Sequence, residues 1–254
     1  MSLEIILAGF FIGTMIGLTG MGGGSIVTPI MIFIFRVQPV FAVGTDLVLS
    51  ALTKTAGAVT HFRLGNVDMK ITRTLLSGSI PGALLGLLFF RILPSLHIVS
   101  ADSIIRHALG VVLLIVSAGL FYPPIWKFAE KFKSSPDRKE SVWIIRGVSF
   151  AVGLAVSITS VGSGSIFVPF MLAIFTLPLS RVVGIDVFHG AILTAVAGAG
   201  HIVSGTVDLP LLANLLVGSV PGVVLGSKLS VSFPKRAMEI ILGSMLVLSG
   251  IKLL

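Results

Sequence analysis

Residues 17–31 read GLTGMGGGSIVTPIM and interrupt a long apolar stretch that runs from residue 3 to residue 36. A continuous helix over that stretch would be about 51 Å long at about 1.5 Å per residue, whereas the hydrocarbon core of a bilayer is about 30 Å thick. Three consecutive glycines at 22–24 disfavour a helix and favour a turn. The stretch is therefore expected to break there, and residues 24–36 then fit a half-helix of about 20 Å.

The composition of the whole chain is that of a multi-pass helical membrane protein. Of its 254 residues, 55% are hydrophobic and 11% are charged, and the mean hydropathy is +1.09, whereas an ordinary soluble domain has about 25% charged residues. This excludes a disordered chain and a soluble enzyme, and the absence of cysteine excludes disulfide and thiolate chemistry. Ten apolar segments are expected, at residues 3–19, 24–36, 42–63, 69–90, 101–122, 143–161, 164–177, 181–203, 208–230 and 235–254.

The two halves of the chain are copies of each other. Matching residues lie 140 positions apart without a gap, and GSIPG at 78–82 returns as GSVPG at 218–222. A polar stretch that contains Pro136 separates the copies. We therefore divide the chain into a first transmembrane repeat at 1–126, a linker at 127–141 and a second repeat at 142–254. The matching pairs include Gly22 and Gly162, Pro29 and Pro169, Gly44 and Gly184, Asp46 and Asp186, and His61 and His201.

The distribution of positive charge distinguishes two membrane topologies. The chain has 18 Lys and Arg against 10 Asp and Glu, and in a membrane protein this excess indicates the positive-inside bias and not a nucleic-acid partner. If residues 3–36 and 143–177 are hairpins that return to their own side, thirteen cations lie on the linker side and four on the other. If each stretch crosses once, the split is ten to seven. The sequence thus favours inverted repeats, each a glycine-broken hairpin of half-helices plus three spanning helices, with a cytoplasmic linker and both termini outside.

The two glycine- and serine-rich turns are the strongest candidates for a binding site. Irregular backbone inside a membrane leaves amide groups without partners, and the starts of two half-helices carry positive partial charge. Both features suit a small anion. The alternative is that the glycines only let helices pack closely. The residues expected to bind the anion are Gly22, Gly23, Gly24, Ser25, Thr45, Lys54, Ser163, Gly164 and Ser165.

Ionisable residues inside the apolar segments are candidates for proton coupling. Asp46 and its copy Asp186 each lie near the start of a long apolar segment, and His189 follows Asp186 by about one turn. A carboxylate inside a membrane can bind and release a proton. The alternative is that each aspartate caps its helix or interacts with the helix dipole. Lys54 lies well inside a segment, and we expect it to be a counter-charge for the anion or a partner of Asp46.

Two histidines lie at matching places near the ends of their segments. His61 and His201 are candidates for a gate or a proton relay, although an interfacial, hydrogen-bonded histidine is the simpler interpretation. The histidines are not clustered at metal-ligand spacing, and the motifs of metalloproteases, dinucleotide-binding enzymes, serine hydrolases and P-loop proteins are absent. No enzyme activity, cofactor or metal is therefore expected.

Two further pairs of features are expected to be structural. Asp68 and Asp208 each precede an apolar segment and are predicted to cap the helix that follows. The glycines within 78–86 and 218–226 recur at intervals of four residues beside a proline, a pattern typical of close helix packing.

Several of these motifs together resemble a known family. GLTGMGGGSIVTPIM at 17–31, AVGTDL at 42–47, HFRLGNVD at 61–68 and GSIPGALLG at 78–86, all echoed in the second half, are similar to motifs of the TauE/SafE sulfite exporter family. The resemblance covers the chain outside the linker. It implies a multi-pass transporter of the inner membrane of a prokaryote, with a cargo such as sulfite, sulfoacetate or a related organosulfonate.

The sequence departs from this family at two places. Thr45-Asp46 stands where threonine and serine are usual, and the second glycine cluster is thinned to Ser163-Gly164-Ser165. An acid in each repeat beside an anion site favours proton-coupled movement or a different anion over a simple sulfite uniporter.

The sequence therefore predicts an all-α secondary transporter that holds a small sulfur anion between half-helix starts at the membrane midplane. Two alternatives stay open, an anion channel or facilitator and a membrane scaffold without cargo. An intramembrane enzyme is the least favoured, because no nucleophile and base lie at usable spacing. The expected partners are the anion and the lipid bilayer, without nucleic acid, and the apolar pattern singles out no oligomer interface.

Overall fold

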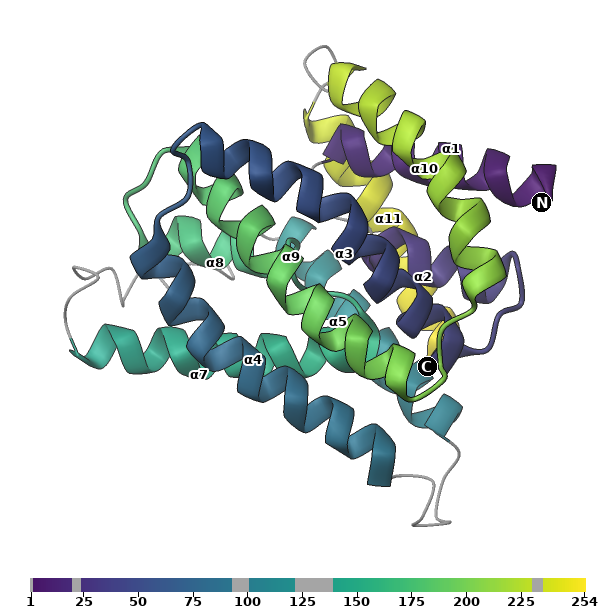
Figure 1. Ribbon diagram of the computed structural model, residues 1–254, viewed down its shortest axis with the longest axis horizontal. Coiled ribbons are helices and arrows are strands. Elements are labelled where there is room, and N and C mark those ends of the chain that lie inside the picture. The colour runs from purple at the N-terminus through teal and green to yellow at the C-terminus, as the bar shows by residue number, and fades with distance from the viewer. Residues whose placement is uncertain (1, 20–23, 93–100, 122–138, 230–234) are drawn as a thin grey trace.

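The computed structural model describes residues 2–19, 24–92, 101–121, 139–229 and 235–254, which form ten helices and no strand (Figure 1). The expected all-α class is therefore confirmed. The first repeat contains α1 (Leu3–Thr19), α2 (Gly24–Phe33), α3 (Pro39–Arg63), α4 (Met69–Ile92) and α5 (Ala101–Phe121). The second repeat contains α8 (Phe167–Ile174), α9 (Leu179–Val203), α10 (Leu209–Leu229) and α11 (Lys235–Leu253). It also contains most of α7 (Lys139–Thr159), which begins inside the expected linker at 127–141.

Five of the described helices, α4, α5, α7, α9 and α10, are long and apolar enough to cross a membrane. The helices after the breaks, α2 and α8, are short, with 10 and 8 residues. The helix before the second break is longer than the expected half-helix, because α7 has 21 residues and a length of about 32 Å. No glycine cluster or proline interrupts the apolar run of α7 before Thr159. The break thus joins one long helix to one short helix.

The outer helices connect the two repeats to each other. α1 of the first repeat packs along α10 of the second, and α7 of the second packs along α4 of the first. A Cβ atom on Gly13 would collide with Ser219, and one on Gly153 would collide with Ser79. Cβ atoms on the glycines of α4 and α10 would likewise collide with atoms of α7 and α1. The predicted role of these glycines in close helix packing is confirmed.

The centre of the molecule is formed by α3 and α9, which pack against each other in opposite directions (Figure 1). The order of their contacts shows the direction, since Gly57 lies against Val187, whereas Gly198, later in α9, lies against Val48, earlier in α3. The contacts between α5 and α11 have the same reversed order. Each of these helices therefore packs antiparallel to its own counterpart in the other repeat.

The local sequence explains where several helices begin. Pro39 is the first residue of α3, a position at which a missing amide proton has no cost. Asp68 caps α4, because its Oδ1 accepts a hydrogen bond from the amide of Lys70 at 3.0 Å. Asp208 caps α10 by accepting from the amide of Leu211 at 3.0 Å. Both predicted caps are confirmed.

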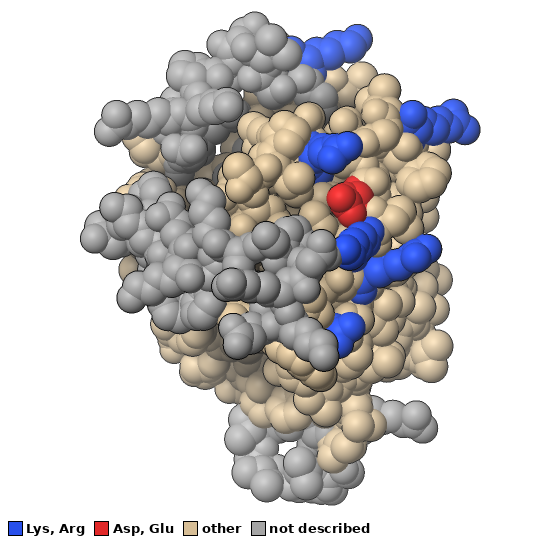
Figure 2. Space-filling model, turned by 90° about the vertical axis from the view of Figure 1, so that its left-hand side faces the viewer, with Lys and Arg blue, Asp and Glu red and all other residues tan. Residues whose placement is uncertain are grey.

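Much of the outer surface is apolar and suits contact with lipid. Large side chains such as those of Leu7, Leu84, Val111, Trp143 and Leu248 are exposed, and apolar surface of this extent marks an interaction with a membrane or a partner. Figure 2 shows the face at the left of Figure 1, where Lys and Arg side chains gather with little acidic surface between them. The end of α3 and the starts of α4, α7 and α9 lie on this side of the molecule.

Candidate functional site

The buried charged side chains of the described residues gather on the two central helices. Asp46 and Lys54 lie in α3 and Asp186 lies in α9, and none of the three is more than 9% exposed. Asp46, Ser50 and Lys54 follow one another at intervals of four residues, so they share one face of α3. Lys54 is within electrostatic range of both carboxyl groups. Two carboxyl groups and one amino group are therefore enclosed where the repeats meet.

Neither aspartate caps a helix. α3 begins at Pro39 and α9 begins at Leu179, so Asp46 and Asp186 lie about two turns inside their helices. A capping side chain must reach the free amides of the first turn, and these carboxyl groups are too far along the helix to do so. The interpretation of the two aspartates as helix caps is therefore wrong.

Asp46 is surrounded by hydroxyl groups. Its Oδ2 accepts hydrogen bonds from Thr28 Oγ1 at 2.8 Å and from Ser160 Oγ, and its Oδ1 accepts one from Ser50 Oγ at 3.3 Å. The hydroxyl groups of Thr28 and Ser160 are 3.0 Å apart. These donors come from α2, from α3 and from the turn after α7, so both repeats contribute to the environment of this one carboxyl group.

Lys54 extends from α3 into the second repeat. Its Nζ donates a hydrogen bond of 2.6 Å to the Oγ of Ser163, in the turn that precedes α8. Gly190 of α9 provides the room, because a Cβ atom at that position would lie 2.8 Å from Nζ. The expected pairing of Lys54 with Asp46 is thus not a hydrogen bond. The amino group is bonded instead to a residue predicted to bind the anion.

The second carboxyl group has a different environment from the first. The Oδ1 of Asp186 is buried and has no hydrogen-bond partner in the part of the chain that the structure describes. His189 lies next to Ser79 of α4, with 2.8 Å between Nε2 and Oγ, and its ring packs edge-on against Phe167. The Nδ1 of His189 is likewise buried without a partner among the described residues. Asp186 and His189 therefore each have one buried polar atom that can still form a hydrogen bond.

The start of α2 meets the turn before α8 at the interface of the repeats. Ser25 Oγ and Ser165 Oγ are 3.5 Å apart, and Ser163 carries the hydrogen bond from Lys54. The backbone amides of Ser163, Gly164 and Ser165 donate no hydrogen bond to any group in the described ranges. Hydroxyl, amide and amino donors from both repeats are thus gathered in one buried place.

The remaining four predicted anion-binding residues are Gly22, Gly23, Gly24 and Thr45. Gly22 and Gly23 lie outside the described residues. The Oγ1 of Thr45 accepts a hydrogen bond from the backbone amide of Asp208 at 3.0 Å, so Thr45 anchors the start of α10. Gly24 begins α2 and packs against the backbone of the turn after α7, where a Cβ atom would collide. Its small size lets the start of α2 approach Ser160.

The two matching histidines lie in different environments. His201 is 2% exposed, and its Nδ1 and Nε2 lie 2.8 Å from Thr206 Oγ1 and 3.0 Å from the carbonyl oxygen of Ser157. His61 is half-buried, and its Nδ1 lies 3.4 Å from the side-chain nitrogen Nδ2 of Asn66. His201 is therefore a fully hydrogen-bonded residue that connects α9 to α7, whereas His61 has one longer contact.

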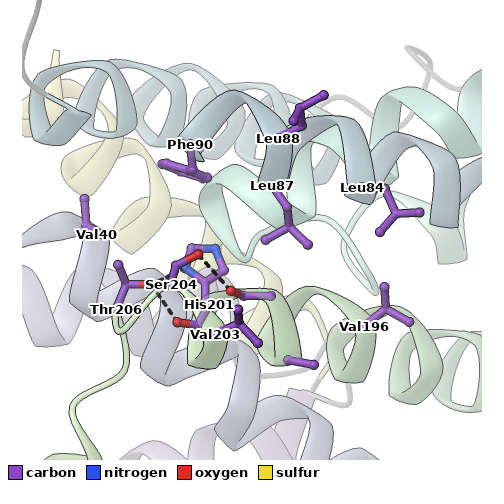
Figure 3. Close-up of a pocket in the computed structure, with 12 residues that line it drawn as sticks. Val40, Leu84, Leu87, Leu88, Phe90, Val196, His201, Val203, Ser204 and Thr206 are labelled. Carbon is purple, nitrogen blue, oxygen red and sulfur yellow. Dashed lines mark hydrogen bonds between the residues drawn. The ribbon is translucent and has the colours of Figure 1, made fainter. Parts of the chain in front are cut away.

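His201 also lines a pocket between α4 and α9 (Figure 3). The pocket has a volume of about 800 Å³, and leucines and Phe90 of α4 form its upper wall in the figure. Ser204 and Thr206 give it a few polar atoms near His201. It contains none of the predicted anion-binding residues. Its walls suit an apolar occupant and not a small anion.

The site residues that sequence reasoning missed are small and uncharged. They are Thr28 and Ser160, which bind Asp46, together with Ser79 and Gly190. Hydroxyl residues and glycines are common in membrane helices for packing reasons alone. Their residue type therefore does not indicate a role in a functional site. A comparison of the repeats could have found Ser160, since the matching position of the first repeat is a glycine.

Comparisons with known proteins agree with this architecture. Residues 5–253 match the family model described as sulfite exporter TauE/SafE. The chain is 39% identical over 262 residues to "Probable membrane transporter protein YjnA" of Bacillus subtilis (strain 168), with the full length of both chains covered. It is 27% identical to "Probable membrane transporter protein YdhB" of the same organism, over 92% of this chain and 93% of the relative. It is also 27% identical to "Probable membrane transporter protein MJ0441" of Methanocaldococcus jannaschii, over 98% of this chain and 94% of the relative.

No solved structure matches the chain significantly. The family match covers nearly the whole sequence, and the relatives are named as membrane transporters and not as enzymes. The described helices include enough apolar spans for a multi-pass protein of this kind. The chain belongs to the TauE/SafE sulfite exporter family of membrane transporters.

Proposed function

We propose that this protein is a secondary transporter of a small sulfur-containing anion, such as sulfite, sulfoacetate or a related organosulfonate. The observation that carries the proposal is the meeting of Ser25 and Ser165 from the two repeats, 3.5 Å apart, beside the hydrogen bond between Lys54 and Ser163. Hydroxyl, amide and amino groups can all donate hydrogen bonds to an oxyanion. The description of the family supports a sulfur anion as the cargo.

The electrostatics of the site favour an anion for two reasons. α2 begins at Gly24 and α8 begins at Phe167, and the start of a helix carries positive partial charge and free amide groups. The amide groups of 163–165 are without partners among the described residues, and a bound anion would satisfy them. Lys54 adds a full positive charge in a buried place, where electrostatic interactions are stronger than in water.

We further propose that the two repeats have inverted orientations in the membrane. α3 and α9 pack antiparallel, and α4 runs in the same direction as α9, since Ser79 contacts His189 and Leu87 contacts Gly200. The contacts between α4 and α7 also keep the same order. α7 and α9 thus share a direction, which supports a return of the chain through α8 between them. Such broken helices near inverted repeats are typical of secondary transporters.

The distribution of charge supports one orientation of this arrangement. Arg63 ends α3, Lys70 and Arg73 lie near the start of α4, and Arg181 lies near the start of α9. Arg146 lies about two turns inside α7. These helix ends lie on the basic face of Figure 2. The positive-inside rule assigns this face and the linker to the cytoplasm. Both termini are then outside, in the inner membrane of a prokaryote.

Proton coupling is assigned to Asp186 and His189 in this proposal. Each has one buried polar atom without a partner in the described ranges, and an acid or histidine inside a membrane is commonly part of a proton pathway. Asp46, the third predicted coupling residue, accepts three hydroxyl hydrogen bonds. These bonds satisfy its charged form and make it the less suitable proton carrier. His61 and His201, predicted as gate or relay residues, lie away from this cluster near the ends of α3 and α9.

Binding and flux measurements test the proposed function. Thermal unfolding of the purified protein is measured with sulfite, sulfoacetate and sulfate, because a ligand that binds the folded state raises its apparent stability. The anion that stabilises the protein is then followed in proteoliposomes with an imposed pH gradient. Saturable uptake that responds to the gradient supports a coupled transporter. Unsaturated flux without a response to the gradient would support a facilitator, and the absence of both binding and flux would support a scaffold.

A further inference from the structure

The hydroxyl groups around Asp46 are different from the one that bonds to Lys54. Thr28, Ser50 and Ser160 all donate to this one carboxyl group from three different segments. None of the three hydroxyl groups bonds to Lys54, whose partner is Ser163. Together with the two carboxyl oxygens they place five buried side-chain oxygens in one cluster. We call Asp46, Thr28, Ser50 and Ser160 the Asp46 cluster.

The internal repeat shows that this cluster belongs to one half of the molecule only. Asp46 has a counterpart in Asp186, at the matching position 140 residues later. The three hydroxyl donors have none, because the matching positions of Thr28, Ser50 and Ser160 are valine, glycine and glycine, at 168, 190 and 20. The architecture shared by the repeats therefore requires the aspartate but not its hydroxyl partners. The hydroxyl residues at these three positions are therefore specific to Asp46 and are not repeated at the positions that match them.

Ser160 has a backbone conformation that glycine would adopt without strain. Its φ is 60°, a left-handed conformation that is strained for a residue with a Cβ atom and that glycine adopts freely. The first repeat has glycine at the matching position. Serine thus occupies a place that favours glycine, and its hydroxyl group adds a hydrogen bond to Asp46. Strained residues of this kind concentrate at functional sites.

The charges of the enclosed cluster are not balanced by protein groups alone. The buried charged residues in the described ranges are two aspartates and one lysine. With both aspartates ionised, the centre carries one uncompensated negative charge, which is costly in a low-dielectric environment. A bound anion adds another. An additional positive charge would therefore stabilise the cluster when an anion is bound.

We propose that the Asp46 cluster binds a small monovalent cation such as Na⁺. Its ligands are oxygen atoms, which hard cations prefer, and one carboxyl group matches a single positive charge. The cluster lies where α7 ends at Thr159, and the end of a broken helix presents carbonyl oxygens and negative partial charge to a cation. The three hydroxyl groups donate to Asp46. A hydroxyl group can rotate, so each of them can also offer an oxygen lone pair to a cation.

The cation site extends the proposed function and does not depend on the identity of the anion. With a cation at Asp46, a proton at Asp186 and the charge on Lys54, the cluster loaded with one monovalent anion is electrically neutral. Cation binding would then favour anion binding by charge compensation, which is a reciprocal coupling between the two sites. The proposal predicts that binding of the cation itself is measurable with no sulfur anion present.

The test is thermal unfolding of the purified protein in sodium chloride against choline chloride at constant ionic strength, without a sulfur anion. Sodium is expected to raise the melting temperature saturably, since it binds the folded state. Thr28→Val and Ser160→Gly copy the residues of the other repeat, so the fold is expected to accept them. Each is expected to raise the half-saturating sodium concentration about tenfold, because one of few ligands is lost. Asp46→Asn is expected to abolish the response.

A matched variant separates this site from general effects of salt. Thr55→Ala removes an exposed hydroxyl of the same helix and is expected to keep the sodium response. Equal melting temperatures in sodium and choline would overturn the proposal, as would an unchanged response in Thr28→Val and Ser160→Gly. A sodium response in a protein that binds no sulfur anion would leave the cation site standing and refute the proposed cargo.

Discussion

The Nζ of Lys54 in α3 lies 2.6 Å from the Oγ of Ser163, a residue 109 positions later in the other repeat. The amino group thus lies beside the backbone amides of the turn before α8, which have no partners among the described residues. The amino group and the backbone amides are all hydrogen-bond donors, so they cannot bond to each other. Both are complementary to an anion, and this relationship is the basis of the predictions on binding.

Replacement of Lys54 by methionine is expected to remove most of the affinity for the anion. Methionine keeps much of the volume but loses the charge, and a hydrogen bond to a charged group contributes about 1.5–3 kcal/mol. The apparent Kd for the stabilising anion should rise about 10- to 100-fold, as measured by thermal shift. Thr55→Ala, at an exposed neighbour in the same helix, should leave the Kd unchanged. An unaltered Kd in the Lys54 variant would exclude it from the anion site.

Loss of the two facing hydroxyl groups is expected to weaken the same binding step. In the double variant Ser25→Ala, Ser165→Ala, two neutral donors are removed, each contributing about 1 kcal/mol. The Kd should rise about 10- to 30-fold, and isothermal titration provides the measurement. Thr74→Ala removes an exposed hydroxyl of α4 that bonds only to its own helix, and it serves as the control. Equal affinities in both variants would place the anion elsewhere.

Asp186→Asn is expected to separate anion movement from the proton gradient. Asparagine resembles the protonated carboxylic acid in size and polarity but cannot release a proton. Uptake into proteoliposomes should therefore lose its response to an imposed pH gradient, while exchange of anion across the membrane continues. The measurement is the ratio of initial rates with and without the gradient. A variant that still responds like the native protein would show that Asp186 is not the proton carrier.

Close packing between the repeats is expected to make some glycines of α7 essential for stability and others dispensable. A Cβ atom on Gly153 would collide with the backbone of Ser79, whereas one on Gly147 would meet no atom within 4 Å. Gly153→Ala should destabilise the fold by about 1–3 kcal/mol through overpacking, and Gly147→Ala should be neutral or slightly stabilising. Melting temperatures in detergent provide the comparison. Equal melting temperatures for the two variants would contradict the interlocked packing.

Membrane topology can be tested with cysteines, because the natural sequence has none. Leu64 and Ser204 are the residues that follow α3 and α9, and both are exposed. Inverted repeats predict that single cysteines at these matching positions react with an impermeant thiol reagent from opposite sides of the membrane. Leu64→Cys should be protected in intact cells and Ser204→Cys should be labelled. Reaction of both from the same side would favour parallel repeats.

The amino-acid sequence by itself determined the class of the protein, most helix positions, the two breaks and the internal repeat. These features depend on local properties, namely the lengths of apolar runs, the poor helix formation of glycine clusters and the identity of residues 140 positions apart. Asp68 and Asp208 were predicted as caps for the same reason, since a cap bonds to amides within its own first turn. The sequence also identified Asp46, Asp186 and Lys54, because charges inside apolar segments are rare.

Only the tertiary structure decided which of these residues meet. Lys54 bonds to Ser163, Thr45 bonds to the amide of Asp208, and three hydroxyl groups from separate segments surround Asp46. Such contacts depend on how α3 and α9 cross and on how closely the glycines let the outer helices approach. The periodicity of the sequence predicts neither the crossing nor the separation of the helices. Hydroxyl residues carry no charge and little hydropathy signal, so their roles become visible only when the chain brings them to a buried carboxyl group.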